Sequence, residues 1–567
     1  MKQLGFISNN KTSALIDKGN IVWLPLPRFD SPSLFTRLLD EEGGEFSIYL
    51  EEEPKMSYVY PNVLKTEAQG VEIIDIMPKG ESGIIRYIKT EKPLKAIIKP
   101  LFNYGLYKPI IEERKRGFRF LNPIDNDCLA LISDKIKRTG YFEWEILPGE
   151  IYIYLIYSSD EKYGPFNKGS SLIYDLKHSF RRSFTYWKNF YEKNKIKNKK
   201  DILDVIYETS IWILLSLIYS PTGAVIAAPT TSLPEVEGGG RNWDYRYAWV
   251  RDSSIIAEAL LKAGYIVEAR RIINFFFGLV NFTSKPFLHP LYTIDGDDPP
   301  PEIEINWLSG YKNSKPVRIG NAAAMQIQLD IEGFFLDAVY QYYSLTKDKV
   351  FLEENWEAIK YIAEWEDKNW KLKDAGIWED RGKPRHYIHS KVMMWVAMDR
   401  AEKLAKEINK EVSWDKEELK KWILENGVKD GHFVQHTETM EVDASLLTLP
   451  LYGFISEKDR IFLNTLKKIQ EDLVVKEIYV KRYKSDSLGE AKHPFALTTL
   501  WLARVYTKLG IDSRKIIENV FKPSLYIAGE HIDIERNEYT GNYPQAFVHA
   551  QGILAIKEIK SLDREYP

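Results

Sequence analysis

The pattern of hydrophobic residues changes near residue 170, and this change limits the folds open to the chain. Before it, short apolar or alternating runs are separated by Gly, Pro, Asp and Asn; they lie at 20–26, 45–50, 71–76, 83–90, 94–100 and 151–157. Successive side chains of a strand point to opposite faces, so such runs predict an antiparallel β-sandwich.

Helical spacing dominates the rest of the chain. We expect a linker helix at 175–194 and eleven further helical segments at 201–220, 253–277, 320–345, 351–368, 388–407, 415–425, 442–454, 457–470, 494–508, 513–520 and 545–560. Eleven segments are close to six antiparallel pairs, and long loops between paired helices favour a toroid with its functional site at the loop end. An α-solenoid is the alternative, but the sequence shows no fixed-period repeat.

Length and charge narrow the class of protein. A chain of 567 residues is too long for one hydrophobic core, and we expect domains at 1–195 and 196–567. The net charge of −3 argues against nucleic acid as a partner. The most apolar run, 211–219, is too short to cross a bilayer, and the first residues lack the apolar core of a signal peptide. The single cysteine, Cys128, favours a reducing compartment, so we expect a cytoplasmic protein.

Two acidic residues stand out as a candidate catalytic pair. Glu379 follows Trp378 in GIWEDRG, and Glu530 lies in AGEHID. Hydrolysis of a glycosidic bond with inversion needs one carboxyl group that holds a proton and one that is ionised, about 6.5–9.5 Å apart. An apolar wall such as Trp378 would raise the pKa of the first. The plain alternative is that Glu379 is one of many acids on a solvated surface.

Aromatic and charged residues alternate in GGGRNWDYRYAWVRDSS, residues 238–254. Aromatic rings suit the flat C–H faces of sugars, and aromatic residues make up 13% of the chain. Arg251 can donate hydrogen bonds to sugar hydroxyls and Asp252 can accept them. The alternative is an edge strand with an ordinary ion pair, followed by a helix cap at Asp252.

Together these motifs resemble glycoside hydrolase family 15, the family of glucoamylases, glucodextranases and some microbial trehalases. The resemblance covers nearly the whole length and includes residues 5–35, 242–254, 315–333, 376–401, 442–447 and 529–550. It implies an (α/α)6 barrel preceded by a β-sandwich. It also implies inversion at the anomeric carbon, without metal or cofactor.

The resemblance also implies roles for single residues. By motif position, Glu379 corresponds to the general acid and Glu530 to the general base. Arg251 and Asp252 match residues that grip the non-reducing-end glucose. Tyr245 matches an aromatic residue beside the reacting carbon and the water. The other expected substrate-binding residues are Trp249, a wall of the same subsite, and Trp378 and Asp380, which flank the general acid.

Arg482 is a further expected sugar-binding residue. Residues 481–495 resemble a fungal Arg-Tyr-Pro-Glu-Asp stretch followed by Asn-Pro-Trp-Phe, with His493 in place of Asn and the Trp absent. The alternative is a basic loop before a helix that begins near Pro494. We expect structural roles for His386 and His389, because no third metal ligand is signalled nearby.

The resemblance favours glucoamylase activity, the release of β-D-glucose from the non-reducing ends of α-1,4-linked malto-oligosaccharides or starch. α,α-Trehalase is the main rival, because the N-terminal segment and PQAF (544–547) also resemble the trehalase-like branch. A non-catalytic sugar-binding protein and a phosphorylase fit less well, since both Glu379 and Glu530 are present. By fold analogy we also expect a homo-oligomer.

Overall fold

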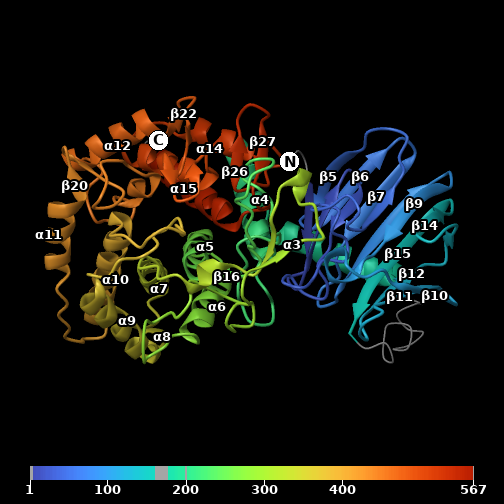
Figure 1. The fold of residues 1–567 in the computed structure, drawn as a ribbon, viewed down its shortest axis with the longest axis horizontal. Coiled ribbons are helices and arrows are strands. Elements are labelled where there is room, and N and C mark those ends of the chain that lie inside the picture. The colour runs from blue at the N-terminus through green and yellow to red at the C-terminus, as the bar shows by residue number, and fades with distance from the viewer. Residues whose placement is uncertain (1–3, 160–175, 198, 200, 566–567) are drawn as a thin grey trace.

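The computed structural model describes residues 4–159, 176–197, 199 and 201–565. These residues form an all-β part followed by a helical part. Figure 1 shows the strands, blue to cyan, on one side of the molecule and the helices, green to red, on the other. The predicted fold class, an antiparallel β-sandwich followed by a helical toroid, is confirmed. The boundary predicted between residues 195 and 196 stays a prediction.

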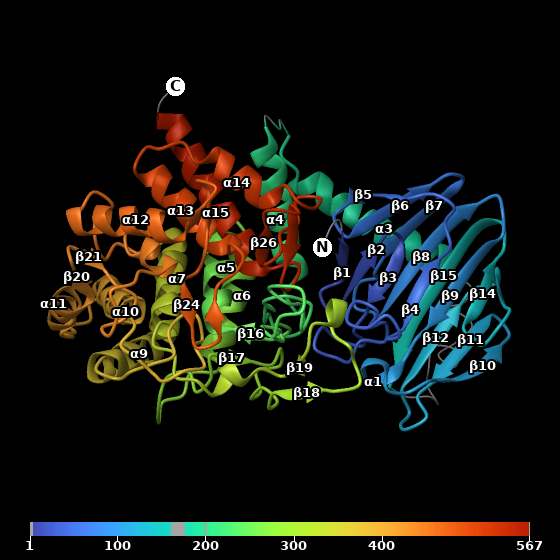
Figure 2. The same cartoon turned by 45° about the horizontal axis from the view of Figure 1, so that its top comes forward.

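Two antiparallel sheets pack together in the β-part (Figure 2). One is 7-stranded, with the order β1-β2-β3-β4-β9-β14-β13, and the other is 8-stranded, with the order β10-β11-β12-β15-β8-β7-β6-β5. The elements are β1 Leu4–Ser8, β2 Ser13–Asp17, β3 Asn20–Trp23, β4 Glu45–Ile48, β5 Lys55–Tyr60, β6 Val63–Ala68, β7 Val71–Ile76, β8 Gly83–Thr90, β9 Leu94–Lys99, α1 Phe102–Gly105, β10 Ile110–Arg114, β11 Gly117–Leu121, β12 Cys128–Ile132, β13 Ile136–Arg138, β14 Glu143–Ile146 and β15 Gly149–Ser158. Buried residues of both sheets, among them Phe46, Ile88 and Leu129, form one hydrophobic core.

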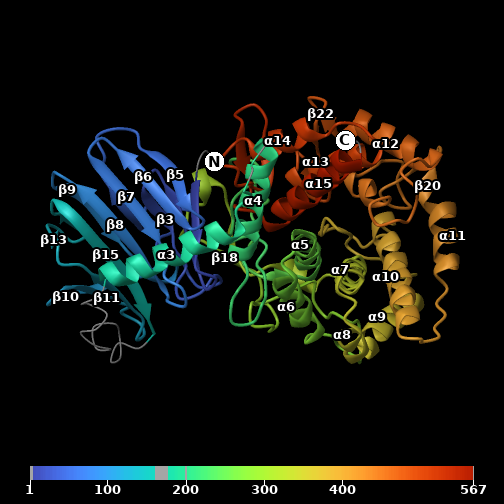
Figure 3. The ribbon, with the colours of Figure 1, turned by 180° about the vertical axis from the view of Figure 1, so that it is seen from behind.

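A long helix joins the two parts. α3 (Leu176–Asn194) packs against β5, β7 and β15 on its way to the helical part (Figure 3). Its buried side chains include Phe180 and Trp187, which belong to a small cluster with the outer face of the 8-stranded sheet. The predicted linker helix is confirmed from Leu176 onward; residue 175 lies outside the described residues.

The helical part is an (α/α)6 toroid. Its main elements are α4 Ile202–Ser216, α5 Val250–Ala263, α6 Ile266–Phe277, α7 Ile331–Thr346, α8 Lys349–Glu354, α9 Trp356–Asn369, α10 Ile388–Glu407, α11 Lys416–Gly427, η3 Ala444–Thr448, α12 Arg460–Leu473, α13 Ala496–Lys508, α14 Arg514–Phe521 and α15 Ala546–Glu565. The inner layer is α5, α7, α10, η3, α13 and α15, which pack successively and close when α15 meets α5. α4, α6, α9, α11, α12 and α14 pack outside them.

The loops of the helical part carry short secondary structure. The short helices are η1 Tyr311–Asn313 and η2 Ala322–Met325. The short strands are β16 Ala248–Trp249, β17 Leu291–Tyr292, β18 Ile303–Ile305, β19 Val317–Ile319, β20 Val428–Lys429, β21 His432–Phe433, β22 Val474–Val475, β23 Tyr479–Val480, β24 Ser485–Asp486, β25 Gly489–Glu490, β26 His531–Asp533 and β27 Glu538–Thr540.

Four predicted helices differ in the structure. The segment 351–368 is divided between α8 and α9 at Asn355. The segment 253–277 is two helices, α5 and α6, because the backbone turns at Gly264, whose φ of 90° favours glycine. The segment 320–345 becomes a continuous helix only from Ile331, at the start of α7. The segment 442–454 holds only the short η3 before a run of turns.

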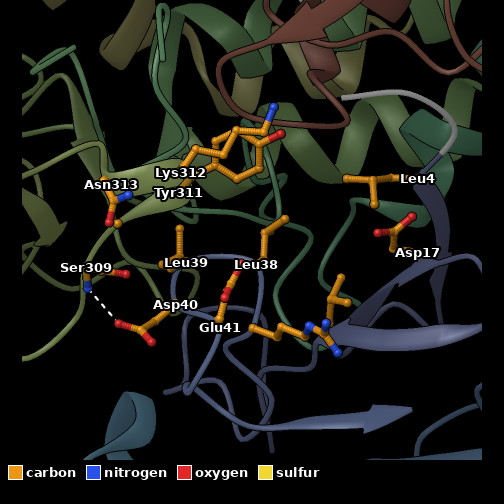
Figure 4. Close-up of a pocket in the computed structure, with 13 residues that line it drawn as sticks. Leu4, Asp17, Leu38, Leu39, Asp40, Glu41, Ser309, Tyr311, Lys312 and Asn313 are labelled. Atoms are coloured by element: carbon orange, nitrogen blue, oxygen red, sulfur yellow. Dashed lines mark hydrogen bonds between the residues drawn. The ribbon is translucent and has the colours of Figure 1, made fainter. Parts of the chain in front are cut away.

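The β-part shares its core with the toroid. Phe6, Trp23 and Phe29 belong to the same buried cluster as the inner helices, and the Phe6 ring stacks on Trp212 of α4 with 6.4 Å between centroids. A hollow of about 470 Å³ remains at this junction, between residues 37–41 and 309–313 (Figure 4). At its edge the Ser309 N–H donates a hydrogen bond to Asp40. The shared core explains why the two parts pack as one unit.

Candidate active site

Three inner helices, α5, α13 and α15, contribute residues to one pocket, together with the loops that precede inner helices. Trp249, Tyr387 and Phe495 stand directly before α5, α10 and α13, where the unpaired N–H groups of a helix favour nearby negative charge. The pocket is lined by Ala227, Tyr245, Trp249, Arg251, Asp252, Ile255, Ile377, Trp378, Glu379, Arg482, Phe495, Leu497, Trp501, Glu530 and Phe547. Residues distant in sequence therefore meet here, including both acids of the expected catalytic pair.

Glu379 lies on a turn before α10 with a left-handed backbone. Its φ is 57°, a conformation that a residue with a side chain rarely adopts. Its N–H donates to the Gly376 carbonyl at 3.1 Å, and the Gln326 side chain donates to its carbonyl at 3.1 Å. Backbone strain of this kind costs on the order of 1–3 kcal/mol and is found at functional sites, where the surroundings hold it in place.

Two hydrogen-bond donors meet the carboxylate of Glu379. The Trp249 indole N–H donates to Oε1 at 3.0 Å, and Arg251 Nη2 donates to the same oxygen at 2.9 Å. The side chain of Glu379 is 21% exposed, so the pocket reaches solvent here. The sequence predicts an apolar wall of Trp378 against this acid. Trp378 lines the same pocket, and the two groups that bind this carboxylate are polar donors, so the apolar wall stays a prediction.

Arg251 is anchored from behind. Its Nη1 donates to Gln328 at 3.0 Å and to Asp330 at 3.2 Å, both just before α7. Its neighbour Asp252 is buried in the pocket lining, and burial raises the pKa of Asp252 to about 7, against the opposing charge of Arg251. An anchored guanidinium and a buried carboxyl group side by side can donate to and accept from adjacent hydroxyls.

Glu530 has a different setting. It is 4% exposed, and its two oxygens accept hydrogen bonds from the Tyr245 hydroxyl at 2.6 Å and from the Asn542 N–H at 3.2 Å. Burial raises the pKa of Glu530 to about 7, although Tyr245, the charge of Arg482 and Asn542 all act in the opposite direction. A carboxyl group poised near neutral pH suits proton transfer.

Aromatic rings connect the two acids across the pocket. Tyr245, which donates to Glu530, packs edge-on against Trp249, which donates to Glu379, with 5.5 Å between ring centroids. The two carboxyl groups therefore face one space but hold separate partners.

Arg482 also lines the pocket and is held by a buried carboxylate. Its Nη2 donates to Glu235 at 2.9 Å, and its guanidinium lies over the rings of Tyr483 and Phe495. Burial would raise the pKa of Glu235, but Arg482 and other neighbouring charges lower it to about 2. Arg482 thus presents a positive charge beside Glu530, held by an acid that stays ionised.

Two predicted substrate-binding residues, Trp378 and Asp380, differ in their relation to the pocket. Trp378 lines the pocket, and its indole N–H donates to Asp443 at 3.1 Å. Asp380 is absent from the described lining. It accepts hydrogen bonds from Tyr387, from the Gly382 N–H and from the Ser487 N–H, so it holds loops together. The predicted contact between Asp380 and a sugar has no support in this geometry.

Several contributors to the site were missed by the sequence analysis. Gln328 and Asp330 lie in QLDIEG, a segment that carries part of the resemblance, but nothing in the pattern points them at Arg251. Glu235 lies just before the three consecutive glycines, and its position there indicates only an acidic residue in a surface loop. Asn542 acts through its backbone N–H, which leaves no side-chain signal.

The described residues contain no group of three or more His, Cys, Asp or Glu side chains arranged to hold a metal ion. His389, which was expected to be structural, is 2% exposed and packs against the Phe334 ring. In the part of the chain that the structure describes, every helix is too short or too polar to cross a membrane.

Comparison with known proteins identifies the family. Residues 203–521 match the family model described as glycosyl hydrolases family 15, and residues 1–139 match the trehalase-like N-terminal model. The chain belongs to glycoside hydrolase family 15. It is a glycoside hydrolase, as its paired acids predict.

Individual relatives agree with this assignment. The chain is 58% identical to "Trehalase 1" of Sulfolobus acidocaldarius, over 99% of both chains. It is 43% identical to "Trehalase 2" of the same organism, over 97% of this chain and 98% of the relative. A bacterial glucoamylase solved with acarbose matches with a TM-score of 0.72 at 15% identity, covering 99% of this chain and 94% of that one. That last match shows the fold alone.

The relatives correct one prediction. The sequence analysis favours a glucoamylase acting on α-1,4-linked glucans, but relatives at 58%, 43% and 32% identity are all named trehalases. The glucoamylase prediction is wrong, and the rival reading is the better supported one. The motifs around Glu379 and Glu530 describe chemistry shared across the family, so they could not separate its members.

Proposed function

We propose that this protein is an α,α-trehalase, which hydrolyses trehalose to two glucose molecules with inversion. The observation that carries the proposal is the 58% identity, over 99% of both chains, with a relative named Trehalase 1. The likeness spans the β-part as well as the toroid. The pocket agrees with it, because paired acids and hydroxyl-binding groups converge in one space.

In this proposal the first glucose sits at the bottom of the pocket. Arg251 donates to its hydroxyls and Asp252 accepts from them, while Trp249 covers one face of the ring. The support is the anchoring of Arg251 by Gln328 and Asp330, which fixes the guanidinium before substrate arrives. Pre-organised groups lose less entropy when they bind.

Glu379 is the proposed general acid and Glu530 the proposed general base. Glu379 gives its proton to the oxygen that joins the two glucose units, and the bond from that oxygen to the attacked anomeric carbon breaks. Glu530 takes a proton from a water that attacks the same carbon from the opposite face. Tyr245 holds Glu530 beside the water. The attacked ring leaves as β-glucose, and the other ring keeps its α configuration.

The second glucose is proposed to lie beyond Arg482. A hollow of about 640 Å³ adjoins the catalytic pocket there, and Glu235, Trp243, Arg318 and Arg381 contribute to its lining. The Arg482–Glu235 ion pair has one residue in the lining of each space. The guanidinium groups of Arg318 and Arg381 lie over the Trp243 ring, 4.5 and 4.0 Å from its centroid. Such groups can donate to sugar hydroxyls.

A side-by-side assay tests the proposal. Glucose release is measured from trehalose, maltose, maltotriose and starch, with the Glu379→Gln variant as the control for contaminating activity. The proposal expects kcat/KM to be highest for trehalose. A higher kcat/KM for maltotriose or starch would contradict the proposal and would group the protein with the glucan-hydrolysing members of the family.

A further inference from the structure

Three contacts from the β-part reach the frame that holds Glu530. The frame consists of the two groups that donate to this carboxylate, Tyr245 and Asn542, and the segment 228–230 that pairs with Tyr245. Each contact ends one residue away from a member of the frame or on the segment itself. None ends on Glu379.

The first contact comes from Trp23 of β3. Its indole N–H donates to the Pro229 carbonyl at 2.8 Å, and Trp23 is fully buried. The residues on either side of Pro229 bind the backbone of Tyr245. The Ala228 N–H donates to the Tyr245 carbonyl at 3.0 Å, and the Tyr245 N–H donates to the Thr230 carbonyl at 3.3 Å. Trp23 therefore fixes the segment along which Tyr245 lies.

The second contact holds Arg246, the next residue after Tyr245. Arg246 is fully buried and donates to the Ser31 carbonyl of the β-part at 3.0 Å. Its guanidinium also forms two hydrogen bonds to Asp244, on the other side of Tyr245, at 2.9 and 2.8 Å. The rings of Trp23 and Tyr104 lie against it at 6.0 and 5.5 Å.

The third contact holds the other donor to Glu530. The Tyr543 hydroxyl donates to the Leu4 carbonyl of β1 at 2.9 Å, and Tyr543 follows Asn542 directly. The Asn542 side chain ties the two halves of the frame together, because it donates to the Trp243 carbonyl at 2.9 Å and accepts from Thr230 at 2.8 Å.

We propose that the β-part is a positioning element for the general base, acting through Trp23, Arg246 and Tyr543 on the Tyr245–Asn542 frame that aims Glu530. The β-part contributes no side chain to the described lining of the catalytic pocket. Its influence on the reaction runs through hydrogen bonds that fix where the Tyr245 hydroxyl and the Asn542 N–H point. The inference rests on the proposed role of Glu530 as the base.

The test compares two buried side chains that both donate across the junction. Trp23→Phe removes the hydrogen bond to Pro229. Ser8→Ala is the matched control: Ser8 is also fully buried and donates to the Ser216 carbonyl of α4 at 2.8 Å, away from the frame. Kinetics are measured with trehalose and with α-glucosyl fluoride, a substrate that needs little protonation but still needs activated water.

Trp23→Phe is expected to lower kcat about tenfold with both substrates, since small misplacements of catalytic groups have large effects on rate. KM should change little, because Arg251 is held by Gln328 and Asp330, which none of the three contacts touches. Ser8→Ala should leave kcat unchanged. In a Tyr245→Phe background the effect of Trp23→Phe on kcat should disappear, because contacts that act through one residue are not additive.

Tyr543→Phe provides an independent arm if Trp23→Phe folds poorly, since it removes one hydroxyl from a ring of nearly the same volume. It too should lower kcat with both substrates. The inference is overturned if the Trp23 and Tyr543 variants keep wild-type kcat, or if Trp23→Phe costs as much in the Tyr245→Phe background as alone. A wild-type enzyme that hydrolyses glucosyl fluoride but not trehalose would refute the proposed substrate and leave this test intact.

Discussion

Glu379 and Glu530 are the same residue type in one pocket, and the structure surrounds them differently. Glu379 sits on a strained turn, is partly exposed and meets the cation Arg251. Glu530 is buried and accepts from two neutral donors, Tyr245 and the Asn542 N–H. The first is tied to the inner helices α5 and α7 through Arg251 and Asp330. The second is tied to the β-part through its frame.

This difference indicates that each of the two acids of the expected catalytic pair is held by its own set of hydrogen-bond donors. An acid must release its proton toward the leaving oxygen, and a base must hold an ionised oxygen toward water. A single network around both groups would couple their charges and their movements. Here Tyr245 and Trp249 touch through their rings, but each donates to a different acid.

The largest expected effect comes from exchanging each acid for its amide. Glu530→Gln should lower kcat by a factor of about 10²–10⁴ with both trehalose and α-glucosyl fluoride, because water activation is lost in each case. Glu379→Gln should abolish turnover of trehalose and affect the fluoride much less. Equal losses for both variants on both substrates would erase the distinction between the two acids.

The next effect concerns the glucose-binding side of Glu379. Asp252→Ala should cost about 3–5 kcal/mol in kcat/KM, since it leaves sugar hydroxyls without their buried acceptor. The loss should be the same for trehalose and maltose, which share the first glucose. Kinetics on both sugars check this, and near-normal kcat/KM would leave Asp252 only a structural role in the first turn of α5.

The raised pKa of Glu530 predicts a pH-dependent stability. The folded protein holds this proton up to about pH 7, while an unfolded chain releases it near the ordinary glutamate pKa of 4.5. The contribution to the free energy of unfolding is therefore fully present below about pH 4.5 and is lost as the pH rises through 7, by on the order of 3 kcal/mol. The raised pKa of Asp252 should also make the free energy of unfolding decrease as the pH rises through 7.

Denaturant unfolding at several pH values measures the contribution of Glu530 to the free energy of unfolding. Glu530→Gln has no proton to lose, so its stability relative to wild type should increase between pH 4.5 and pH 7. A constant difference between variant and wild type over that range would contradict the buried setting of Glu530.

The smallest expected effect is a shift in the pH profile. The base works only when ionised, so kcat/KM should rise with pH through the region near 7, where Glu530 and Asp252 both titrate. The hydrogen bond from Tyr245 lowers the pKa of Glu530. Tyr245→Phe should therefore move the acidic limb of the profile to higher pH, by about one unit. A limb that stays in place would show that Tyr245 does not set this pKa.

Much of the fold follows from residue patterns. Alternating runs predict strands such as β7 and β8, and helical spacing predicts α10 and α13 within a few residues. The predicted runs do not include β1, β2, β5, β6 or β10–β14. Exposed side chains weaken the apolar signal of the edge strands β5 and β10, but β1 and β12 are buried throughout, so exposure does not account for their omission. The break between α5 and α6 depends on one glycine, Gly264, that a helical pattern can pass through.

Most residues of the candidate site could also be predicted from the sequence. Motif likeness selected Glu379, Glu530, Tyr245, Trp249, Arg251 and Arg482, and all of them line one pocket. It also selected Asp380, whose oxygens are taken by loop contacts, because neighbouring positions in a turn can face different ways. The left-handed backbone of Glu379 and the reach of Trp23 to Pro229 depend on tertiary packing, which local pattern does not encode.

The substrate was beyond the reach of the motifs. Trehalose and maltose share their first glucose, and Arg251 and Asp252 face only that ring in the proposed complex. What differs is the second ring, which would meet Trp243, Arg318 and Arg381. These residues lie within segments that carry the family resemblance, but the resemblance assigned no role to any of them. Predicted oligomerisation and location in the cell likewise stay predictions, and light scattering would answer the first.

The most direct test of the central claim is the anomeric form of the products at early times, followed by proton NMR during hydrolysis of trehalose. In the proposed mechanism, inversion by Glu379 and Glu530 changes the configuration of the attacked ring and leaves the other ring unchanged. The account predicts equal amounts of β-glucose and α-glucose before mutarotation mixes them. Release of α-glucose alone would show retention and would contradict the assignment of Glu530 as the base that activates water.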